Sequence, residues 1–498
     1  MSGNLGAARP ATANETRDRF GAANQAGIYI GRYYDREREA VGEAITYGGE
    51  RHFLLFGPNG SGKGTRFLLP NLLGGNLKGR SVIAIDPKGE LAAISAQQQH
   101  RSGQNVKILD PFGVLARVTA KRPDDYRYLI EHGLIESVGF NPLDGLDPAS
   151  PTFYDDAAAI GEALIRIQGN DPHWTESAQG LVIGLLMWEK ARNGKGATLE
   201  NVRAMLTEAE QLQSVTGPGG RSVEIPVKGL RATAADMVAE GGYEIASLAA
   251  RFMQTTDEVN SIRSSADTQT RWLLSGPVRA DLAKSGFDFS RLKVEPTTVY
   301  VILPAERLRT HSVWLRLVIV SALRALYQPG GLRTLLLIDE LAALGHLGPL
   351  EDAFGLVRGY RVQITAILQD LNQLQALYHD RWETFIANAG VVMGFAPNDL
   401  TTADWMSKRA GQQTITVMNA SENTSQSTTG QSTGAAMNAQ TQARALYLPQ
   451  ELISLEEGMG MLWLAGMANP VTFFAPPYFK IRDCRATASP NPYYQPDG

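Results

Sequence analysis

One stretch of this chain combines the residue types that can cradle a phosphate. Its residues are Gly57, Pro58, Asn59, Gly60, Ser61, Gly62, Lys63, Gly64 and Thr65. Glycines let consecutive backbone N–H groups turn toward an anion, and the lysine can reach the outer oxygens of the same phosphate. A helix that begins near Arg66 would direct its N-terminal dipole at that anion. The stretch therefore predicts a nucleotide-phosphate site; a glycine-rich turn between a strand and a helix is the alternative.

The residue after the lysine departs from the usual pattern of such loops. Gly64 stands where a serine or threonine commonly supplies a hydroxyl group to Mg²⁺. The hydroxyl must then come from Thr65, one residue later, or be replaced by water. Thr65 is therefore the candidate metal ligand of this stretch.

A pair of acids is the expected partner of the phosphate loop. The apolar run Thr334–Ile338 ends directly at Asp339 and Glu340. An aspartate fixed at the end of a strand can hold Mg²⁺, directly or through water. The adjacent glutamate can orient or deprotonate the attacking water, as a general base must. The alternative is a solvated turn between a strand and a helix.

Two further residues are placed to act on a transferring phosphoryl group. Gln369 follows the apolar run Ile364–Leu368 and is positioned to sense a γ-phosphate; a surface glutamine is the alternative. Arg358 and Arg361 flank Gly359-Tyr360, between the two runs. An arginine supplied by a neighbouring subunit often meets the charge of the transition state. An ordinary surface salt bridge is the competing explanation for these arginines.

The elements that must position these residues form an alternating pattern. Apolar runs that each end in a polar loop occur at 81–85, 106–109, 298–303, 334–338, 362–368 and 391–395, with helix-length segments between most of them. Such runs indicate a parallel sheet covered on both faces, which gives an α/β fold. Ligands of such sheets bind at the carboxyl ends of the strands, where Asp86 and Asp110 would also lie.

The chain divides into segments of different character. We expect a flexible N-terminal tail over 1–25, a first part of the nucleotide-binding domain over 26–145 and an all-α inserted domain over 146–285. The second part of the nucleotide-binding domain follows over 286–482, with a long polar loop at 412–442, and a tail over 483–498 closes the chain. Residues 26–50 alternate enough to suggest a hairpin before the phosphate loop.

Composition excludes several classes of protein. At 498 residues the chain is too long for one core. No uninterrupted apolar stretch of about 18 residues exists, and the polar start lacks a secretory signal. The single cysteine, Cys484, suits a reducing cytoplasm. The net charge of -4 implies that any contact with DNA uses a local basic patch or a pore.

A family resemblance emerges once further motifs are added to these. In order along the chain they are the GKG phosphate loop, IDPKGE, LDPFG, FNPLDG, EPTTVYVILP, LLLIDELAALG, ILQDLNQL and FAPND. Together they resemble the type IV secretion coupling proteins of the TraG type, which are conjugative DNA-transfer ATPases. The resemblance runs from about residue 50 to 482.

The resemblance implies a RecA-like P-loop domain with an inserted all-α domain, assembled as a hexameric ring with ATP and Mg²⁺ between subunits. It places the family's loop lysine on Lys63 and the strand-end acids on Asp339 and Glu340. It places the family's glutamine on Gln369 and the arginine finger on Arg358. The GKG variant is usual in that family.

The implied function is that of a coupling ATPase, which recruits DNA and translocates it toward a type IV secretion channel. The DNA would be single-stranded and attached to a relaxase. An ATPase that delivers protein effectors, or a nucleotide-gated recruitment adaptor with little turnover, are the alternatives. Family members commonly begin with membrane-spanning helices, and residues 1–50 contain none. We therefore expect a cytoplasmic protein that is either a soluble variant of the family or reaches the cytoplasmic face of the inner membrane only through a partner.

Overall fold

The computed structural model describes residues 6–20, 26–167, 172–216, 222–427 and 430–494; for 419–438 it describes the backbone alone. The chain folds as two compact units. The first contains residues 1–77 and 365–486, and the second contains 78–364 and 487–498. These boundaries differ from the expected domain limits at 145 and 285, and each unit is described by itself.

The first unit carries the phosphate loop. Its helices are α1 (Ala13–Phe20), α2 (Leu69–Leu73), α15 (Leu371–Tyr378), α16 (Trp382–Asn388), α17 (Leu400–Ala410), α18 (Pro449–Ile453) and α19 (Arg482–Thr487). Its strands are β1 (Ile28–Asp35), β2 (Ala40–Tyr47), β3 (His52–Phe56), β11 (Ala389–Phe395), β12 (Gln412–Ser427), β13 (Gly430–Ala445), β14 (Met459–Leu464) and β15 (Val471–Phe474). The end of β10 (Val362–Leu368) also belongs to it.

Strand β3 is central in the first unit, because every one of its residues is buried. It pairs in parallel with β10 on one side and with β11 on the other, so that Phe56 lies opposite both Leu368 and Gly394. Beyond β11 the order continues through β14, β15, β1 and β2 with antiparallel pairing. The expected hairpin before the phosphate loop is the pair β1–β2.

The second unit contains the strand-end acids. Its strands are β4 (Ser81–Asp86), β5 (Asn105–Leu109), β6 (Gln211–Thr216), β7 (Ser222–Lys228), β8 (Thr297–Ile302) and β9 (Thr334–Ile338). Its helices are α3 (Glu90–Arg101), α4 (Val114–Thr119), α5 (Arg127–Glu131), α6 (Phe153–Leu164), α7 (His173–Asn193), α8 (Leu199–Thr207), α9 (Leu230–Glu240), α10 (Gly242–Ala249), α11 (Asp257–Thr270), α12 (Gly276–Leu282), α13 (Leu308–Leu326) and α14 (Gly348–Leu356).

Four strands of the second unit form a parallel array in the order β9-β4-β8-β5. Strands β4, β8 and β9 are buried along their whole length, as their uninterrupted apolar character predicts. Because these strands run in one direction, Asp86, Asp110 and Asp339 lie at the same edge of the array. The α/β fold with a mostly parallel sheet is thus confirmed.

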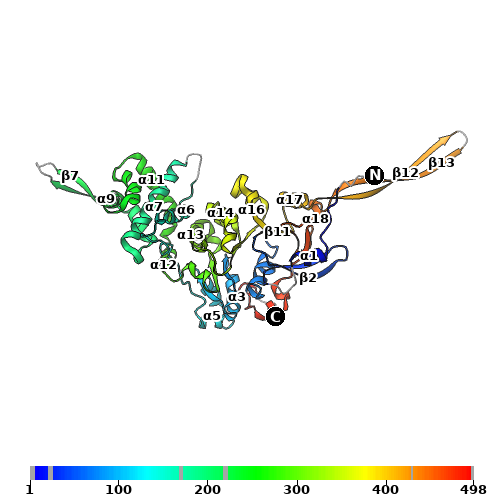
Figure 1. Ribbon diagram of the computed structural model, residues 1–498, viewed down its shortest axis with the longest axis horizontal. Helices are drawn as coiled ribbons and strands as arrows, with labels where there is room; N and C mark the ends of the chain where they lie inside the picture. Colours follow the sequence, from blue (N-terminus) through cyan, green and yellow to red (C-terminus); the bar gives the residue numbers. More distant parts are fainter. Residues whose placement is uncertain (1–5, 21–25, 168–171, 217–221, 428–429, 495–498) are drawn as a thin grey trace. The chain divides into compact units, whose positions relative to one another are not determined.

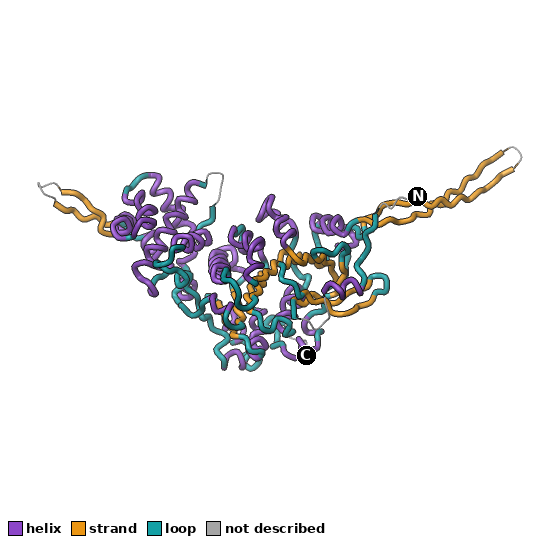
Figure 2. Tube along the Cα trace, in the orientation of Figure 1, coloured by secondary structure: helices purple, strands orange, loops and turns teal. Residues whose placement is uncertain are grey.

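Helices α6 to α12 form a separate cluster of the second unit, called the helical insertion below (Figure 1). We expected helices alone here, and the structure adds the antiparallel hairpin β6–β7, seen as paired strands beside the helices in Figure 2. Between these two strands the sequence has a Gly/Pro-rich segment at 216–220, of which all but Thr216 lies outside the described residues. Both strands are mostly exposed, and the apolar alternation of Val223, Ile225 and Val227 in β7 was the signal that could have located the hairpin.

The expected polar loop at 412–442 is instead a long hairpin of β12 and β13. The two strands pair in continuous register from Gln412 opposite Ala445 to Ser427 opposite Gly430. Figure 1 shows the ribbon extending beyond α17 and α18. Its backbone groups satisfy one another, so the strands need no apolar core to pair. The expectation of a loop rested on polarity alone, and it was wrong.

The N-terminal residues that the structure describes are also ordered. Helix α1 covers Ala13–Phe20, and the backbone of Ala7 bridges to Gln413 of β12. The flexible tail expected over 1–25 therefore does not describe 6–20. Among the described residues, none of the helices combines the length and apolar character that crossing a membrane requires.

Candidate nucleotide-binding site

The phosphate loop begins where β3 ends, and its backbone is turned by glycines. The N–H of Gly57 donates to the carbonyl of Leu368 at 2.9 Å, which fixes the start of the loop to β10. Gly60 and Gly62 have φ values of +84° and +82°. Only glycine adopts this conformation readily, so the sequence permits the turns that aim backbone N–H groups inward.

Side chains of the loop fit a bound phosphate. Lys63 Nζ donates to the carbonyl of Gly57 at 2.5 Å, which holds the ammonium group across the mouth of the loop. Ser61 Oγ is buried, and within the described residues it has no hydrogen-bond partner. Buried hydroxyls almost always have a partner, so this one is available to an anionic ligand. The loop therefore fits the nucleotide that its sequence predicts.

The segment after the lysine is a π-helical turn rather than an α-helical one. It covers Lys63–Leu68, and the N–H of Leu69 donates to the carbonyl of Gly64 five residues earlier. A π-turn takes up one more residue than an α-turn and frequently occurs at functional sites. Thr65 Oγ1 donates to the carbonyl of Gly62 at 3.3 Å, so the late hydroxyl faces back toward the loop. Its role as a magnesium ligand stays a prediction.

The buried side chain of Arg66 packs against the phosphate loop. Arg66 is 7% exposed and donates from Nη1 to the carbonyl of Ala475 at 2.8 Å. Its Nη2 forms an ion pair with Glu457. The side chain lies so close to two glycines that a Cβ at Gly62 would come 2.8 Å from its Cδ, and one at Gly458 would come 2.5 Å from its Nη1. Sequence reasoning missed this role, because the partners lie about 400 residues away.

Gln369 lies beside the phosphate loop. It follows Leu368, which is opposite Phe56 in the paired strands, and its N–H donates to Gln373 Oε1 at 2.9 Å. The structure thus brings Gln369 and the loop of Lys63 together within the first unit. Its role as a sensor of the γ-phosphate stays a prediction.

A cavity of about 230 Å³ adjoins the same loop. Ser61 lines it together with Asn398, Glu456 and Glu457. Asn398 belongs to the FAPND motif, to which sequence analysis assigned no role. The motif itself was the signal that could have located this wall of the site.

The strand-end acids lie in the second unit, where β9 ends. Asp339 and Glu340 are both half-buried. Glu340 has φ +75° and ψ +67°, in the left-handed region that residues other than glycine rarely adopt. Such a conformation costs about 1–3 kcal/mol and concentrates at functional sites. The conformation supports a functional role for Glu340, which stays a prediction.

Asp86 and Asp110 each stabilise the turn that follows their strand. Asp86 accepts hydrogen bonds from the N–H groups of Glu90 and Ala92 at 3.0 and 2.9 Å, at the start of α3. Burial raises the pKa of Asp86 to about 7, and the nearby negative charge of Asp339 adds to the shift. Asp110 similarly accepts from the N–H of Leu115 at 2.8 Å.

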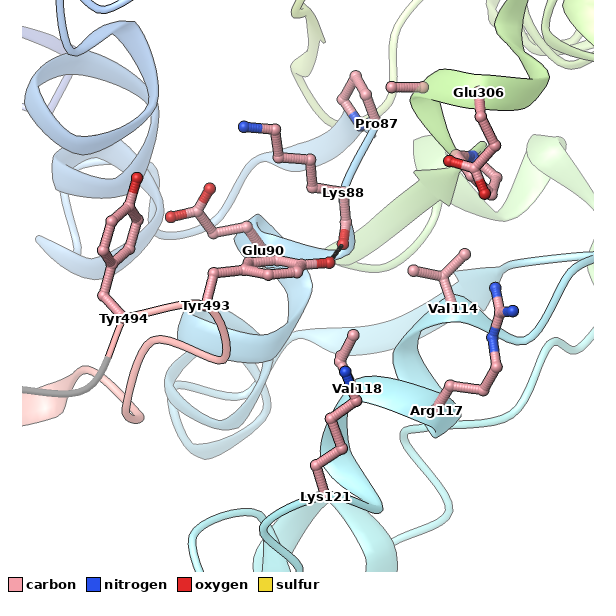
Figure 3. Close-up of a pocket in the computed structure, with 12 residues that line it drawn as sticks. Pro87, Lys88, Glu90, Val114, Arg117, Val118, Lys121, Glu306, Tyr493 and Tyr494 are labelled. Carbon is pink, nitrogen blue, oxygen red and sulfur yellow. Dashed lines mark hydrogen bonds between the residues drawn. The ribbon is translucent and has the colours of Figure 1, made fainter.

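Pro87, Lys88 and Glu90 of the IDPKGE motif line a cavity of about 520 Å³ (Figure 3). Lys88 and Glu90 border it, and the hydroxyl of Tyr493 donates to the carbonyl of Lys88. Asn491 Nδ2 donates to Glu90 Oε1 at 2.6 Å. The described end of the chain therefore forms one wall of this cavity.

The two candidate arginines have different surroundings. Arg361 donates from Nη1 to the carbonyl of Gly331 at 2.8 Å and so supports a neighbouring turn. Arg358 is exposed, and its guanidinium makes no hydrogen bond or ion pair within the described part of the chain. The salt bridge that competed with a finger role is therefore not found for Arg358.

The family follows from a match over most of the chain. A family model described as type IV secretory system conjugative DNA transfer matches residues 6–120 and 134–495. The chain belongs to this family. The match therefore covers the motifs that suggested the family and most of the sequence between them.

Individual relatives and solved structures agree with this assignment. The conjugal transfer protein TraG of Rhizobium radiobacter is 28% identical over 437 residues, which cover 85% of this chain and 61% of that protein. TraG of Agrobacterium fabrum is 27% identical over 465 residues, covering 90% and 63%. The chain thus spans about three fifths of the length of these relatives.

Solved structures of the coupling protein TrwB share the fold. An unbound form has a TM-score of 0.64 at 15% identity and covers 94% of this chain and 92% of that one. A complex of TrwB with a non-hydrolysable ATP analogue also has a TM-score of 0.64 at 15% identity, covering 95% and 94%. At this identity the likeness establishes the fold.

Proposed function

We propose that this chain is an ATPase that couples ATP hydrolysis to the movement of DNA toward a type IV secretion channel. The observation that carries the proposal is the phosphate loop, with Lys63 across its mouth and the Ser61 hydroxyl without a partner, in a member of the conjugative DNA transfer family. TrwB, whose fold this chain shares, has been solved with ADP and Mg²⁺.

The loop and the strand-end acids divide the work of hydrolysis. The backbone N–H groups of residues 57–65 and the ammonium of Lys63 bind the phosphates of ATP. Glu340 orients and deprotonates the water that attacks the γ-phosphorus, and Gln369 contacts the γ-phosphate. Hydrolysis transfers the phosphoryl group directly to water, without a covalent intermediate on the enzyme.

Thr65 and Asp339 are the residues that would hold Mg²⁺ in this site. The ion would neutralise charge on the β- and γ-oxygens of the nucleotide. Arg358 would supply its guanidinium to the nucleotide of a neighbouring subunit in a ring of six, which its exposed and unpaired state allows.

The cargo we propose is single-stranded DNA attached to a relaxase. Because the net charge is -4, we expect contact with the DNA backbone to be local and independent of sequence. Components of the type IV secretion channel are the other proposed partners. We place the ATPase at the cytoplasmic face of the inner membrane, held there by a partner protein.

The test is the ATPase rate as a function of added single-stranded oligonucleotide, with molecular mass measured in the same samples. The wild type should be stimulated and shift to a ring, whereas Lys63→Ala should lose at least about 10²-fold in turnover. Glu340→Gln should bind ATP and fail to hydrolyse it. Lys78→Ala, at an exposed lysine outside the loop, is the matched control.

Background turnover in a wild type that still binds ATP would overturn the proposal. The same holds if Lys63→Ala and Lys78→Ala hydrolyse ATP equally well, because the activity would then not come from the phosphate loop.

A further inference from the structure

The turn that follows Glu340 is a short, closed element. It runs from Glu340, with φ +75°, through Leu341–Leu344 to Gly345, with φ +65°. Two hydrogen bonds close it: the N–H of Ala343 donates to the carbonyl of Glu340 at 3.0 Å, and that of Gly345 to the carbonyl of Ala342 at 3.1 Å. Because these hydrogen bonds close the turn and the turn begins at Glu340, whatever holds the turn also positions that glutamate.

One buried arginine holds this turn against the helical insertion. Arg316 of α13 is 3% exposed. It donates hydrogen bonds to the carbonyls of Leu344, in the turn, at 3.2 Å and of His346, directly after the turn. The same guanidinium donates to the carbonyls of Ala163 at 3.1 Å and Glu162 at 3.2 Å, at the end of α6. We call this set of contacts the Arg316 bridge.

The chemistry of the Arg316 bridge is specific to arginine. The last carbonyls of a helix lack partners inside the helix and form the negative end of its dipole, so a cation there is stabilised. The rigid fork of a guanidinium can serve α6 and the turn at once, whereas the single ammonium of lysine cannot reach both sets of carbonyls. The bridge therefore makes the positions of α6 and the turn depend on each other.

A second contact extends the connection into the helical insertion. Gln269 of α11 accepts from the N–H of Arg166 at 2.6 Å and donates to its carbonyl at 2.9 Å. The side chain of Arg166 donates to Ser312 Oγ of α13 at 2.7 Å. It also covers Gly345, where a Cβ would come 3.3 Å from Arg166 Nη1. Helix α11 thus reaches the turn after Glu340 through one residue.

We propose that Arg316 is a positioning residue through which the helical insertion controls the placement of Glu340. Arg166 and Gln269 carry the same coupling from α11. The proposal rests on the proposed role of Glu340 in ATP hydrolysis. A ligand that displaces the insertion would move the turn through these contacts and so change the rate of hydrolysis without touching the nucleotide. A misplacement of about 1 Å in a catalytic group can cost about 10²-fold in rate.

The test compares three variants of the full chain. Arg316→Lys keeps the charge and loses the fork, and Gln269→Ala loosens Arg166 from a site far along the chain. Arg279→Lys is the control. That arginine of α12 belongs to the same helical insertion, but it donates to Glu200 Oε1 of α8 at 2.9 Å and so lies outside the contacts of the Arg316 bridge and of Gln269. The measurements are kcat, the dissociation constant of a fluorescent ADP, the melting temperature and amide hydrogen exchange.

We expect Arg316→Lys to lower kcat at least about tenfold and Gln269→Ala about threefold, with nucleotide affinity within about twofold of the wild type. The amides of Ala343 and Gly345 should exchange faster in both variants. Arg279→Lys should change neither kcat nor this exchange. The proposal is overturned if Arg279→Lys lowers kcat as much as Arg316→Lys does. It is also overturned if nucleotide affinity and melting temperature fall in parallel with kcat, because Arg316 would then have a structural role.

Hydrogen exchange separates this proposal from the proposed function, because it requires no turnover. If the wild type hydrolyses no ATP, the proposed function falls, and the exchange of Ala343 and Gly345 alone decides whether Arg316 and Gln269 hold the turn. Unchanged exchange in Arg316→Lys overturns the bridge whatever the ATPase rate.

Discussion

The support of the phosphate loop by Arg66 can be tested by the substitution Arg66→Met. Methionine keeps an unbranched apolar stem in place and removes the guanidinium. The change leaves the carbonyl of Ala475 without its donor and ends the ion pair with Glu457. It also removes the charged group that lies against Gly62 and Gly458.

The cost can be worked from the contacts. A buried hydrogen bond with a charged donor contributes about 1.5–3 kcal/mol. The ion pair adds about 0–1 kcal/mol, because the Glu457 side chain is 76% exposed and water screens the pair. We therefore expect Arg66→Met to lower the free energy of unfolding by about 2–3 kcal/mol. Part of this lost stability is local to the phosphate loop, so nucleotide affinity should fall about 3- to 10-fold.

The assays are denaturant unfolding of the full chain, followed by probes in the first unit, and titration with a fluorescent ADP. Glu457→Gln is the control, since glutamine keeps an oxygen that can accept from Arg66, and it should cost less than about 1 kcal/mol. If Arg66→Met unfolds within about 0.5 kcal/mol of the wild type and binds ADP equally well, Arg66 does not support the loop.

Three further predictions follow from single residues. Gly62→Ala should lower the free energy of unfolding by about 2 kcal/mol and weaken ADP binding, because φ is +82° and the new Cβ would meet Arg66. Gly64→Ala is the control: its Cβ meets nothing within 4 Å, so the same unfolding and binding assays should show almost no change. Burial raises the pKa of Asp281 to about 6 from an ordinary 3.8, so the folded chain keeps a proton that the unfolded chain loses. The stabilisation by this group is complete below pH ~4 and is lost as the pH rises through ~6, which lowers the free energy of unfolding by about 3 kcal/mol. Unfolding measured at several pH values should show no such loss in Asp281→Asn. If the free energy of unfolding of Asp281→Asn falls with pH as it does in the wild type, the assignment is wrong. Arg358→Ala should lower kcat about 10³-fold at unchanged stability. Arg361→Ala loses its hydrogen bond to Gly331 and should lower the melting temperature instead. Equal effects of the two substitutions on kcat would contradict the different roles of the two arginines.

Much of the fold was determined by local patterns in the sequence. The buried strands β3, β4, β8 and β9 have continuous apolar runs, because both of their faces are covered, and such runs can be recognised without knowing the neighbours. The phosphate loop was equally readable, since Gly60 and Gly62 are required by backbone conformations that other residues avoid. Polar hairpins left no such pattern, so β12–β13 was mistaken for a loop.

Only the tertiary structure decided the contacts between residues that are distant in the chain. Arg66 lies 409 positions from Ala475, and Arg316 lies 153 from Ala163. Each arginine binds backbone carbonyls, which every residue possesses, so no partner residue type in the sequence marks the contact. The sequence by itself thus determined the type of chemistry to expect at Lys63 and Glu340. The tertiary structure decided how the phosphate loop and the turn after Glu340 are held in place.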